Sequence, residues 1–361
     1  MANQETRLYR PQINLARPTA ARMWLVNLCA LLAVFQSSLT DAFASLILAG
    51  TAAVTALLTE ALIYFRTDRS GTVKDGSAIT SALILTLLLP NHLHPIYAAM
   101  GAAFAMTVAK HSFGGLGANW MNPAVGGWLF VRFSWPHAFT EALEHSGLTK
   151  IAQGLAEGLS DPEGSPLGIL KLVGPGQGAS GSGFLDRFIE SFLNDGLFSL
   201  AKLEFPRMYA ELFNASGPGI IADRGVLGLL LGTVLISASQ SSRGWIPAAY
   251  LGAYLTLVRL FGAIPFGGPF AKGDLFFGLF SGGVLPAAFL LAADPATGPK
   301  SNTGALAVSI AAGGLTFLFR YYGAESYGAL FAIPLLNAAV PLIRDLESRT
   351  LYTAEKRRNI G

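Results

Sequence analysis

Glycine, asparagine and proline are concentrated between residues 111 and 123, where two apolar runs meet. Pro123 suits the first turn of a helix, and Asn122 suits the position that caps it. Asn119, Asn122 and the start of that helix could together receive a polar or anionic group of a ligand. A tight cytoplasmic turn followed by a capped helix explains the same residues, and residue chemistry alone favours this second interpretation.

Acidic side chains also occur near predicted helix ends and inside one apolar run. Asp75 and Asp294 stand beside turn residues at helix ends, where we expect them to cap a helix or a turn. Glu60 lies within a predicted membrane span, and we expect it to reach the interface or to pair with Arg66, about one helical turn away. A cation relay at Glu60 is the less favoured alternative.

The residue types and their spacing predict neither a metal site nor an iron–sulfur cluster in this chain. His92 and His94 flank a turn without a third ligand nearby, so no metal site is predicted. Cys29 is the single cysteine, so the chain can form neither an internal disulfide nor a four-thiolate cluster. No catalytic residue is predicted either, and any redox chemistry must use a cofactor of another kind.

The composition indicates that the bilayer is the main solvent. Of the 361 residues, 52% are hydrophobic and 13% are charged, whereas about a quarter are charged in an ordinary soluble domain. The formal net charge is +3, and no basic block is interleaved with aromatic residues. We therefore expect membrane lipid around the chain and no nucleic-acid partner.

Uncharged runs of the length that crosses a bilayer recur along the chain. They cover 23–40, 42–59, 76–109, 111–131, 225–242, 244–258, 275–293, 301–319 and 326–343. A turn between Pro90 and Pro95 divides the run 76–109 into two helices. Because unbroken apolar runs favour helices over barrel strands, the predicted class is an all-α integral membrane protein with about ten transmembrane helices.

The predicted helices fall into two halves separated by a long loop. The predicted order is a cytoplasmic N-terminal segment 1–22, a first transmembrane half of five helices 23–132, an extracytoplasmic loop 133–222, a second five-helix half 223–344 and a cytoplasmic tail 345–361. Placing both termini in the cytoplasm leaves most lysines and arginines inside. An odd number of helices per half makes the halves inverted, with a site expected near their interface.

The long loop contains two sequence patterns. Residues 174–183 are rich in glycine and include Ser180 and Ser182, and such a backbone is flexible and sterically open. Residues 184–193 place apolar side chains at helical spacing opposite polar ones, which predicts an amphipathic helix on the membrane surface. An ordinary glycine- and serine-rich connector is the alternative for the first pattern.

The stretch from Lys110 to Gly127 closely resembles the signature of one family. That family contains the membrane subunits RnfD, of the Rnf ion-pumping electron-transport complexes, and NqrB, of the sodium-pumping NADH:quinone oxidoreductase. Further segments that resemble it are Lys74–Ala78, Asp294–Thr297, Asn302–Gly304 and Leu336–Ile343. Together they span nearly the whole chain, and the compact N-terminus looks more like RnfD.

The resemblance implies a ten-helix subunit that is not catalytic alone, in a multi-pass position in the bacterial inner membrane. It implies partner subunits that carry iron–sulfur clusters and a second flavin subunit, in a complex of the ferredoxin:NAD⁺ type. Electrons would pass stepwise between flavins and clusters, coupled to movement of Na⁺ or H⁺. The resemblance specifies neither the ion nor the direction of electron flow.

The resemblance also implies flavin sites. In the family, flavin mononucleotide (FMN) is joined through its phosphate to a threonine of the outside loop, ahead of a Leu-Asp-type segment. Here Ser180 falls in that place and Ser182 is a second candidate, with Leu185 and Asp186 following. Serine in place of threonine is a departure from the family pattern. A second, non-covalent flavin such as riboflavin would contact Asn119 and Asn122.

Two other functions remain open. Two inverted five-helix halves with polar breaks are also how solute channels and secondary transporters are built. A scaffold subunit without redox activity is the other alternative, and it predicts that neither Ser180 nor Ser182 is modified. A flavin attached to the chain would exclude both.

Overall fold

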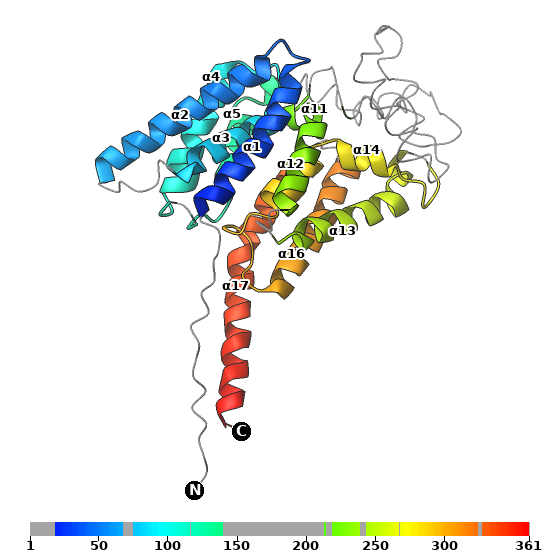
Figure 1. Ribbon diagram of the computed structural model, residues 1–361. Coiled ribbons are helices and arrows are strands. Elements are labelled where there is room, and N and C mark those ends of the chain that lie inside the picture. The colour runs from blue at the N-terminus through cyan, green and yellow to red at the C-terminus, as the bar shows by residue number, and fades with distance from the viewer. Residues whose placement is uncertain are drawn as a thin grey trace.

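The computed structural model describes residues 19–67, 75–115, 117–139, 213, 219–238, 243–266, 268–323 and 327–360, from residue 350 onward as backbone alone. These residues form helices and turns (Figure 1), and their one β-bridge joins Pro90 to Ile220. Ser180, Ser182 and the predicted amphipathic helix 184–193 lie outside the described residues.

The helices follow the apolar runs closely. The first-half helices are α1 (Thr19–Ser38), α2 (Ala44–Thr67), α3 (Ser77–Leu88), α4 (Pro95–Phe104) with the π-helix η2 (Ala105–His111), α5 (Pro123–Ser134) and the 3₁₀ turn η3 (Pro136–Phe139). The second-half helices are α11 (Ile221–Arg224), α12 (Val226–Ala238), α13 (Trp245–Phe261), η7 (Ile264–Phe266), α14 (Leu275–Phe280), α15 (Val284–Pro286), η8 (Ala287–Leu291), α16 (Asn302–Tyr321) and α17 (Gly328–Ile360).

Four of the described helices are long and apolar enough to cross a bilayer, namely those at Thr19–Ser38, Ala44–Arg66, Asn302–Tyr321 and Gly328–Arg349. Three shorter apolar helices accompany them: α3, α12 and α13. The run 275–293 is divided by Gly282 and Gly283, which both have positive φ. The chain is thus a helical membrane protein in which several apolar runs are broken or short.

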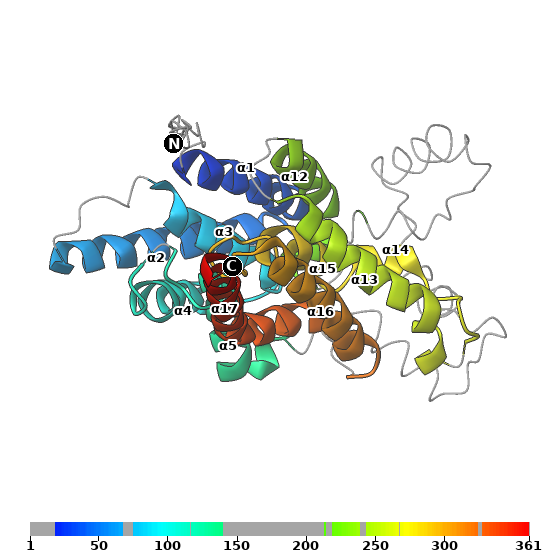
Figure 2. The same ribbon diagram turned by 90° about the horizontal axis from the view of Figure 1, so that it is seen from below.

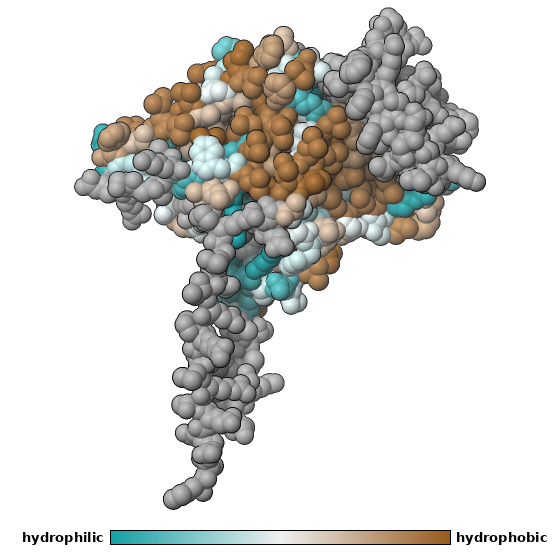
Figure 3. All heavy atoms as spheres, in the orientation of Figure 1, coloured by the Kyte–Doolittle hydropathy of each residue, from teal (hydrophilic) through white to brown (hydrophobic). Residues whose placement is uncertain are grey.

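Apolar side chains on the outside of the body show where lipid would lie. Phe65 is 88% exposed and Leu58 is 66% exposed, both on α2, and Leu231 on α12 is 61% exposed. Brown, hydrophobic side chains cover much of the front of the body in Figure 3. A protein in water rarely exposes this much apolar surface, because contact of apolar side chains with water costs free energy. Hydrocarbon around the helices removes that cost.

The two halves meet along α1 and α12, which lie side by side in Figure 2. Glycines on α12 allow this close approach: a Cβ added to Gly228 would come within 2.5 Å of the backbone of Leu32, and one on Gly232 within 2.6 Å of the Cβ of Cys29. The thiol of Cys29 donates to the carbonyl of Gly232 at 3.1 Å. Small residues are a common means of packing membrane helices.

The helices within each half pack against one another in a similar pattern. In the first half α2 packs against α3 and α4, and in the second α13 packs against α14 and α16. Each half has a break at a left-handed glycine, Gly76 before α3 and Gly283 before α15. Gly76 lies beside Trp24 and Asn27 near the start of α1, whereas Gly283 lies beside Ile220, which bridges to Pro90 beyond the end of α3. The two breaks are therefore at opposite ends of α3.

The expected turn between α3 and α4 is confirmed. His94 caps α4 by accepting a hydrogen bond from the N–H of Ile96 at 3.3 Å, and Pro95 is the first helical residue. The turn also holds the end of the long loop, since the N–H of Asn91 donates to the carbonyl of Gly219 at 3.0 Å. At the other end of the body, α1 begins and α17 leaves on the same side (Figure 1).

Candidate functional site at the junction of the two halves

Asn122 occupies the capping position expected from the sequence. Its Oδ1 accepts a hydrogen bond from the N–H of Ala124 at 3.0 Å, and Pro123 is the first residue of α5. The helix begins here because Pro123 presets the helical φ and Asn122 satisfies an otherwise unpaired amide. The capped-helix interpretation is therefore confirmed, and the turn before it contains Gly114, Gly115 and Gly117, all with positive φ.

The amide nitrogen of the same side chain joins the two halves. Asn122 Nδ2 donates to Asp294 Oδ2 at 3.0 Å, across 172 residues of sequence. Asp294 Oδ1 accepts from the N–H of Ala296 at 3.0 Å, which is the turn expected at Pro295. Burial raises the pKa of Asp294, while the hydrogen bonds from Ala296 and Asn122 oppose this shift. Two segments that resemble the family separately are thus parts of one site.

Asn119 is buried in the turn before α5. Its Oδ1 has no hydrogen-bond partner among the described residues. A buried acceptor without a partner carries a free-energy cost, so Asn119 is suited to receive a donor from outside the chain. The Asn119 Oδ1 accepts no hydrogen bond from Asn122, although both side chains are buried at the same turn of the described structure.

A cavity of about 440 Å³ is lined mostly by residues of the second half, with Asp294 in its wall and Arg22 of α1 from the first half. Its apolar wall comes from α13, α16 and α17, and three cationic side chains, Arg22, Arg243 and Lys300, also line it. Asn337, one of the residues in the segment 336–343, contributes a buried Nδ2 that has no partner among the described residues. Sequence reasoning missed this cavity, although three of the family-like segments line it or border it.

The loop that forms one wall of the cavity is held by arginines. Arg344 on α17 donates to the carbonyls of Ala296 at 3.0 Å and Gly298 at 2.5 Å. Arg243, just before α13, donates to the carbonyl of Lys300 at 3.1 Å. These bonds fix the backbone between η8 and α16, which forms one wall of the cavity beside α13, α16 and α17.

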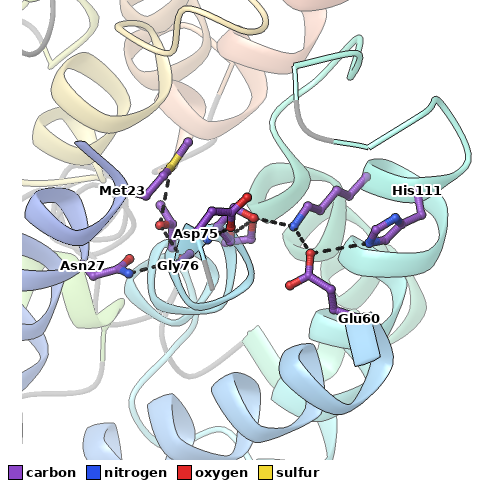
Figure 4. A network of polar contacts seen from close by, with 10 residues as sticks. Met23, Asn27, Glu60, Asp75, Gly76 and His111 are labelled. Carbon is purple, nitrogen blue, oxygen red and sulfur yellow. Dashed lines mark hydrogen bonds and ion pairs between the residues drawn. The ribbon is translucent and has the colours of Figure 1, made fainter. Parts of the chain in front are cut away.

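A second polar cluster lies between α2, α3 and η2 (Figure 4). Lys110 Nζ lies 2.5 Å from Glu60 Oε1 and 2.7 Å from Ser77 Oγ, and it can donate to both. The Nε2 of His111 lies 3.7 Å from Glu60 Oε1. The expected pairing of Glu60 with Arg66 is wrong: Arg66 is exposed at the end of α2, and the carboxylate instead faces η2.

The start of α3 is fixed next to this cluster. Asp75 Oδ1 accepts from the N–H of Ser77, the first residue of α3, at 2.8 Å. The capping position expected for Asp75 is occupied by Gly76 instead, so Asp75 lies one residue before the cap. Asn27 of α1 donates to the carbonyl of Gly76 at 3.3 Å. Figure 4 shows Asn27 and Gly76 on one side of the cluster and Glu60 with His111 on the other.

The second half contains a cluster of similar plan. Arg320 on α16 donates to Tyr254 Oη, to the carbonyl of Gly278 at 2.9 Å and to Ser281 Oγ at 2.8 Å. The carboxylate of Asp223 accepts from the N–H groups of Gly282 and Gly283, at 2.8 and 2.9 Å. Each half therefore places a buried cation against a serine beside a left-handed glycine: Lys110 contacts Ser77, which follows Gly76, and Arg320 contacts Ser281, which precedes Gly282.

Comparison with known proteins relates the whole chain to one group of membrane proteins. Residues 7–353 match the family described as NQR2, RnfD, RnfE. The chain is 31% identical over 295 residues to the subunit named D of the proton-translocating ferredoxin:NAD(+) oxidoreductase complex of Clostridium ljungdahlii, covering 81% of this chain and 79% of that protein.

Two further relatives, each also the subunit named D of its complex, match over more of the chain. The one from the ion-translocating oxidoreductase complex of Erwinia tasmaniensis is 30% identical over 92% of this chain and 94% of its own length. The one from the Na(+)-translocating ferredoxin:NAD(+) oxidoreductase complex of Acetobacterium woodii is 27% identical over 96% of this chain and 94% of its own. The similarity is thus not restricted to isolated segments.

Proposed function

Because the chain belongs to the NQR2, RnfD, RnfE family, we propose that it is the flavin-carrying membrane subunit of an ion-translocating electron-transport complex of the ferredoxin:NAD⁺ type. The observation that carries the proposal is the match along nearly the full length to the corresponding subunits of such complexes. The chain would act as part of a translocase and would not be catalytic alone.

Partner subunits must supply the iron–sulfur clusters, since this chain has a single, buried cysteine. We place the subunit in the bacterial inner membrane as ten spans in two inverted halves, with both termini cytoplasmic. The start of α1 and the exit of α17 on one side, and the breaks at opposite ends of α3, support this arrangement. Na⁺ and H⁺ are both consistent with the names of the relatives.

The covalent flavin of this proposal is FMN, esterified through its phosphate to Ser180, with Ser182 as the second candidate. Both serines lie outside the described residues, so their assignment rests on the family resemblance and on the glycine-rich stretch around them. A bound flavin would supply transfer of one or two electrons, and the protein would supply position and electrostatics.

For the second, non-covalent flavin, we propose the cavity beside Asp294 as the place of its ring. The cavity volume of about 440 Å³ lies within the range of small-molecule sites. Its residues fit such a ring: apolar walls on α16 and α17 would pack against it, and the amide of Asn337 lacks a partner among the described residues. Asn122 would orient the carboxyl of Asp294 at the cavity wall. Asn119 does not line the cavity, and its partnerless carbonyl oxygen would accept a hydrogen bond from a part of the flavin outside it.

A secondary transporter remains the alternative function, because one observation favours it. Both halves bury charged side chains at broken helices, an arrangement that secondary transporters also use for substrate and ion sites. A transporter has no need of a flavin ester in its outer loop. The presence or absence of the ester therefore separates the two functions.

Fluorescence of the denatured subunit tests the proposed function. When the chain is co-expressed with a flavin transferase and separated on a denaturing gel, we expect a flavin-fluorescent band that disappears in Ser180→Ala. Ser182→Ala is the matched control, since it removes a hydroxyl from the same glycine-rich stretch and should keep the band. Loss of the band only in Ser182→Ala would assign the attachment to Ser182. Absence of a fluorescent band from the wild-type subunit would contradict the covalent flavin.

A further inference from the structure

The cavity beside Asp294 has a cationic end and a neutral end. Arg243 and Lys300 are exposed and Arg22 is half-buried, and all three line the cavity. The amide of Asn337, in the same lining, is only 6% exposed. The charged side chains therefore gather where the cavity meets solvent, which we call the cavity mouth, and neutral polar and apolar side chains form its interior.

The three cations lie near the starts of helices, where a positive charge is unfavourable. Arg22 is on the first described turn of α1, Arg243 is two residues before α13, and Lys300 is two residues before α16. The N-terminal end of a helix carries a partial positive charge, which anions stabilise and cations do not. The first turns of α13 and α16 contain no acidic residue. A bound anion would offset both the side-chain charges and the helix charges.

The acidic side chains nearby leave the cavity lining with a net positive charge. Asp294 is the one acid among the lining residues, and its two oxygens accept from Asn122 and from the N–H of Ala296. Glu347 of α17 accepts from Ser301 Oγ at 2.6 Å beside the start of α16, and it is outside the lining. Three cations therefore face the cavity against a single carboxyl group.

Two buried donors of the lining lack an acceptor. Arg22 Nε and Asn337 Nδ2 have no hydrogen-bond partner among the described residues. A buried donor without an acceptor carries a free-energy cost, which a ligand with several oxygen atoms would remove. Arg243 is held in place beside Lys300, because it donates to the Lys300 carbonyl at 3.1 Å. The site thus offers both fixed charge and unsatisfied donors.

Phosphate is the anion that suits this combination of groups. Its oxygens accept paired hydrogen bonds from guanidinium groups, and phosphates bind readily at helix N-termini. A cavity of about 440 Å³ has the volume of a small-molecule site, so it has room for more than a phosphate ion. The ligand expected from these features is a phosphate ester with an uncharged part that packs against the apolar walls.

We propose that Arg22, Arg243 and Lys300 form a phosphate subsite at the cavity mouth, and that the cavity binds a phosphate ester whose uncharged part fills the interior. Two sources share this chemistry. One is a non-covalent flavin in its mononucleotide form, and the other is an anionic phospholipid, since basic pockets between membrane helices also bind lipid head groups. The inference rests on the proposed function for the flavin ring alone, because the charges at the mouth carry the phosphate.

Native mass spectrometry of the full chain in detergent tests the proposal with two matched pairs of added probes. FMN differs from riboflavin only by its phosphate, and phosphatidic acid differs from diacylglycerol in the same way. We expect the wild-type chain to bind the phosphate member of one pair about tenfold more tightly than its partner, as charge-assisted hydrogen bonds allow. Preference for FMN identifies the flavin as the source, and preference for phosphatidic acid identifies lipid. Equal binding within both pairs would overturn the proposal.

Variants at the cavity mouth then locate the phosphate. Arg22→Gln/Lys300→Gln removes two charges but keeps the Lys300 carbonyl that holds Arg243, and it should lose the preference. Arg22→Lys/Lys300→Arg keeps both charges and should retain the preference, as should Lys272→Gln, the matched control at an exposed lysine outside the lining. An unchanged preference in Arg22→Gln/Lys300→Gln would refute the subsite.

The same spectra keep this inference separate from the proposed function. A flavin esterified to Ser180 adds a mass that persists when the chain is denatured, whereas a ligand of the cavity is released. Absence of the persistent mass from a chain co-expressed with a flavin transferase would contradict the covalent flavin. The preference within the probe pairs would still decide whether the phosphate subsite exists.

Discussion

Individual side chains of this protein divide into those whose partners are close in sequence and those whose partners are distant. Asp75 and Asn122 each accept a hydrogen bond from an amide two residues away. Residue type with local spacing was sufficient to predict that both bind the start of a helix, although only Asn122 occupies the capping position. Glu60 and Asp294 bind side chains 50 and 172 residues away. Local spacing could not predict either partner, because many polar side chains along the chain could form a hydrogen bond with each carboxylate.

The two roles of Asn122 can be separated by substitution. Asn122→Ala removes the cap of α5 and the bond to Asp294, and loss of a cap alone costs about 1 kcal/mol of stability. Asn122→Ser keeps a capping oxygen but cannot reach Asp294 in the same way. In detergent, thermal unfolding followed by tryptophan fluorescence should therefore show a lower Tm for Asn122→Ala than for Asn122→Ser. Equal values would show that the cap is not the stabilising contact.

The helices themselves were predictable where an apolar run was unbroken. The runs 23–40 and 301–319 correspond to α1 and α16. The run 111–131 was misleading, because α5 begins only at Pro123 and the preceding residues form an irregular turn. Glycine and asparagine weaken a helix without adding charge, so a count of uncharged residues does not detect such a break.

Contact between α1 and α12 gives a test at the level of elements. A methyl group at Gly228 would lie 2.5 Å from the backbone of Leu32, so Gly228→Ala should force the helices apart and cost about 1–3 kcal/mol. Gly252→Ala on α13 is the matched control, since nothing lies within 4 Å of the added Cβ. The Tm should fall for the first variant and stay level or rise for the second; the same Tm for both would contradict this packing.

The molecule as a whole carries an apolar outer surface and a common side for the start of α1 and the exit of α17. Both agree with a membrane subunit, and neither identifies which side is the cytoplasm. That assignment depends on the distribution of lysine and arginine along the chain. Direction across the membrane is thus a prediction from charge alone, and the helical arrangement supports only that the start of α1 and the exit of α17 lie on one side.

Labelling of single cysteines checks this orientation. His137 and Ser348 are exposed residues near the two ends of the body, and the native Cys29 is buried. A membrane-impermeant thiol reagent added to spheroplasts should label His137→Cys, and it should label Ser348→Cys only after the membrane is opened. Labelling of Ser348→Cys in intact spheroplasts would invert or exclude the proposed topology.

Apolar runs, turn residues and local caps by themselves determined that this chain is a helical membrane protein with breaks at glycine and proline. They could do so because hydrophobic burial in lipid and amide capping act over a few residues. Only the tertiary structure decided that Asn122 meets Asp294 beside a cavity, that α1 lies on α12, and that Lys110 rather than Arg66 neutralises Glu60. Those contacts depend on how distant helices pack, and local spacing carries no information about which distant surfaces fit together.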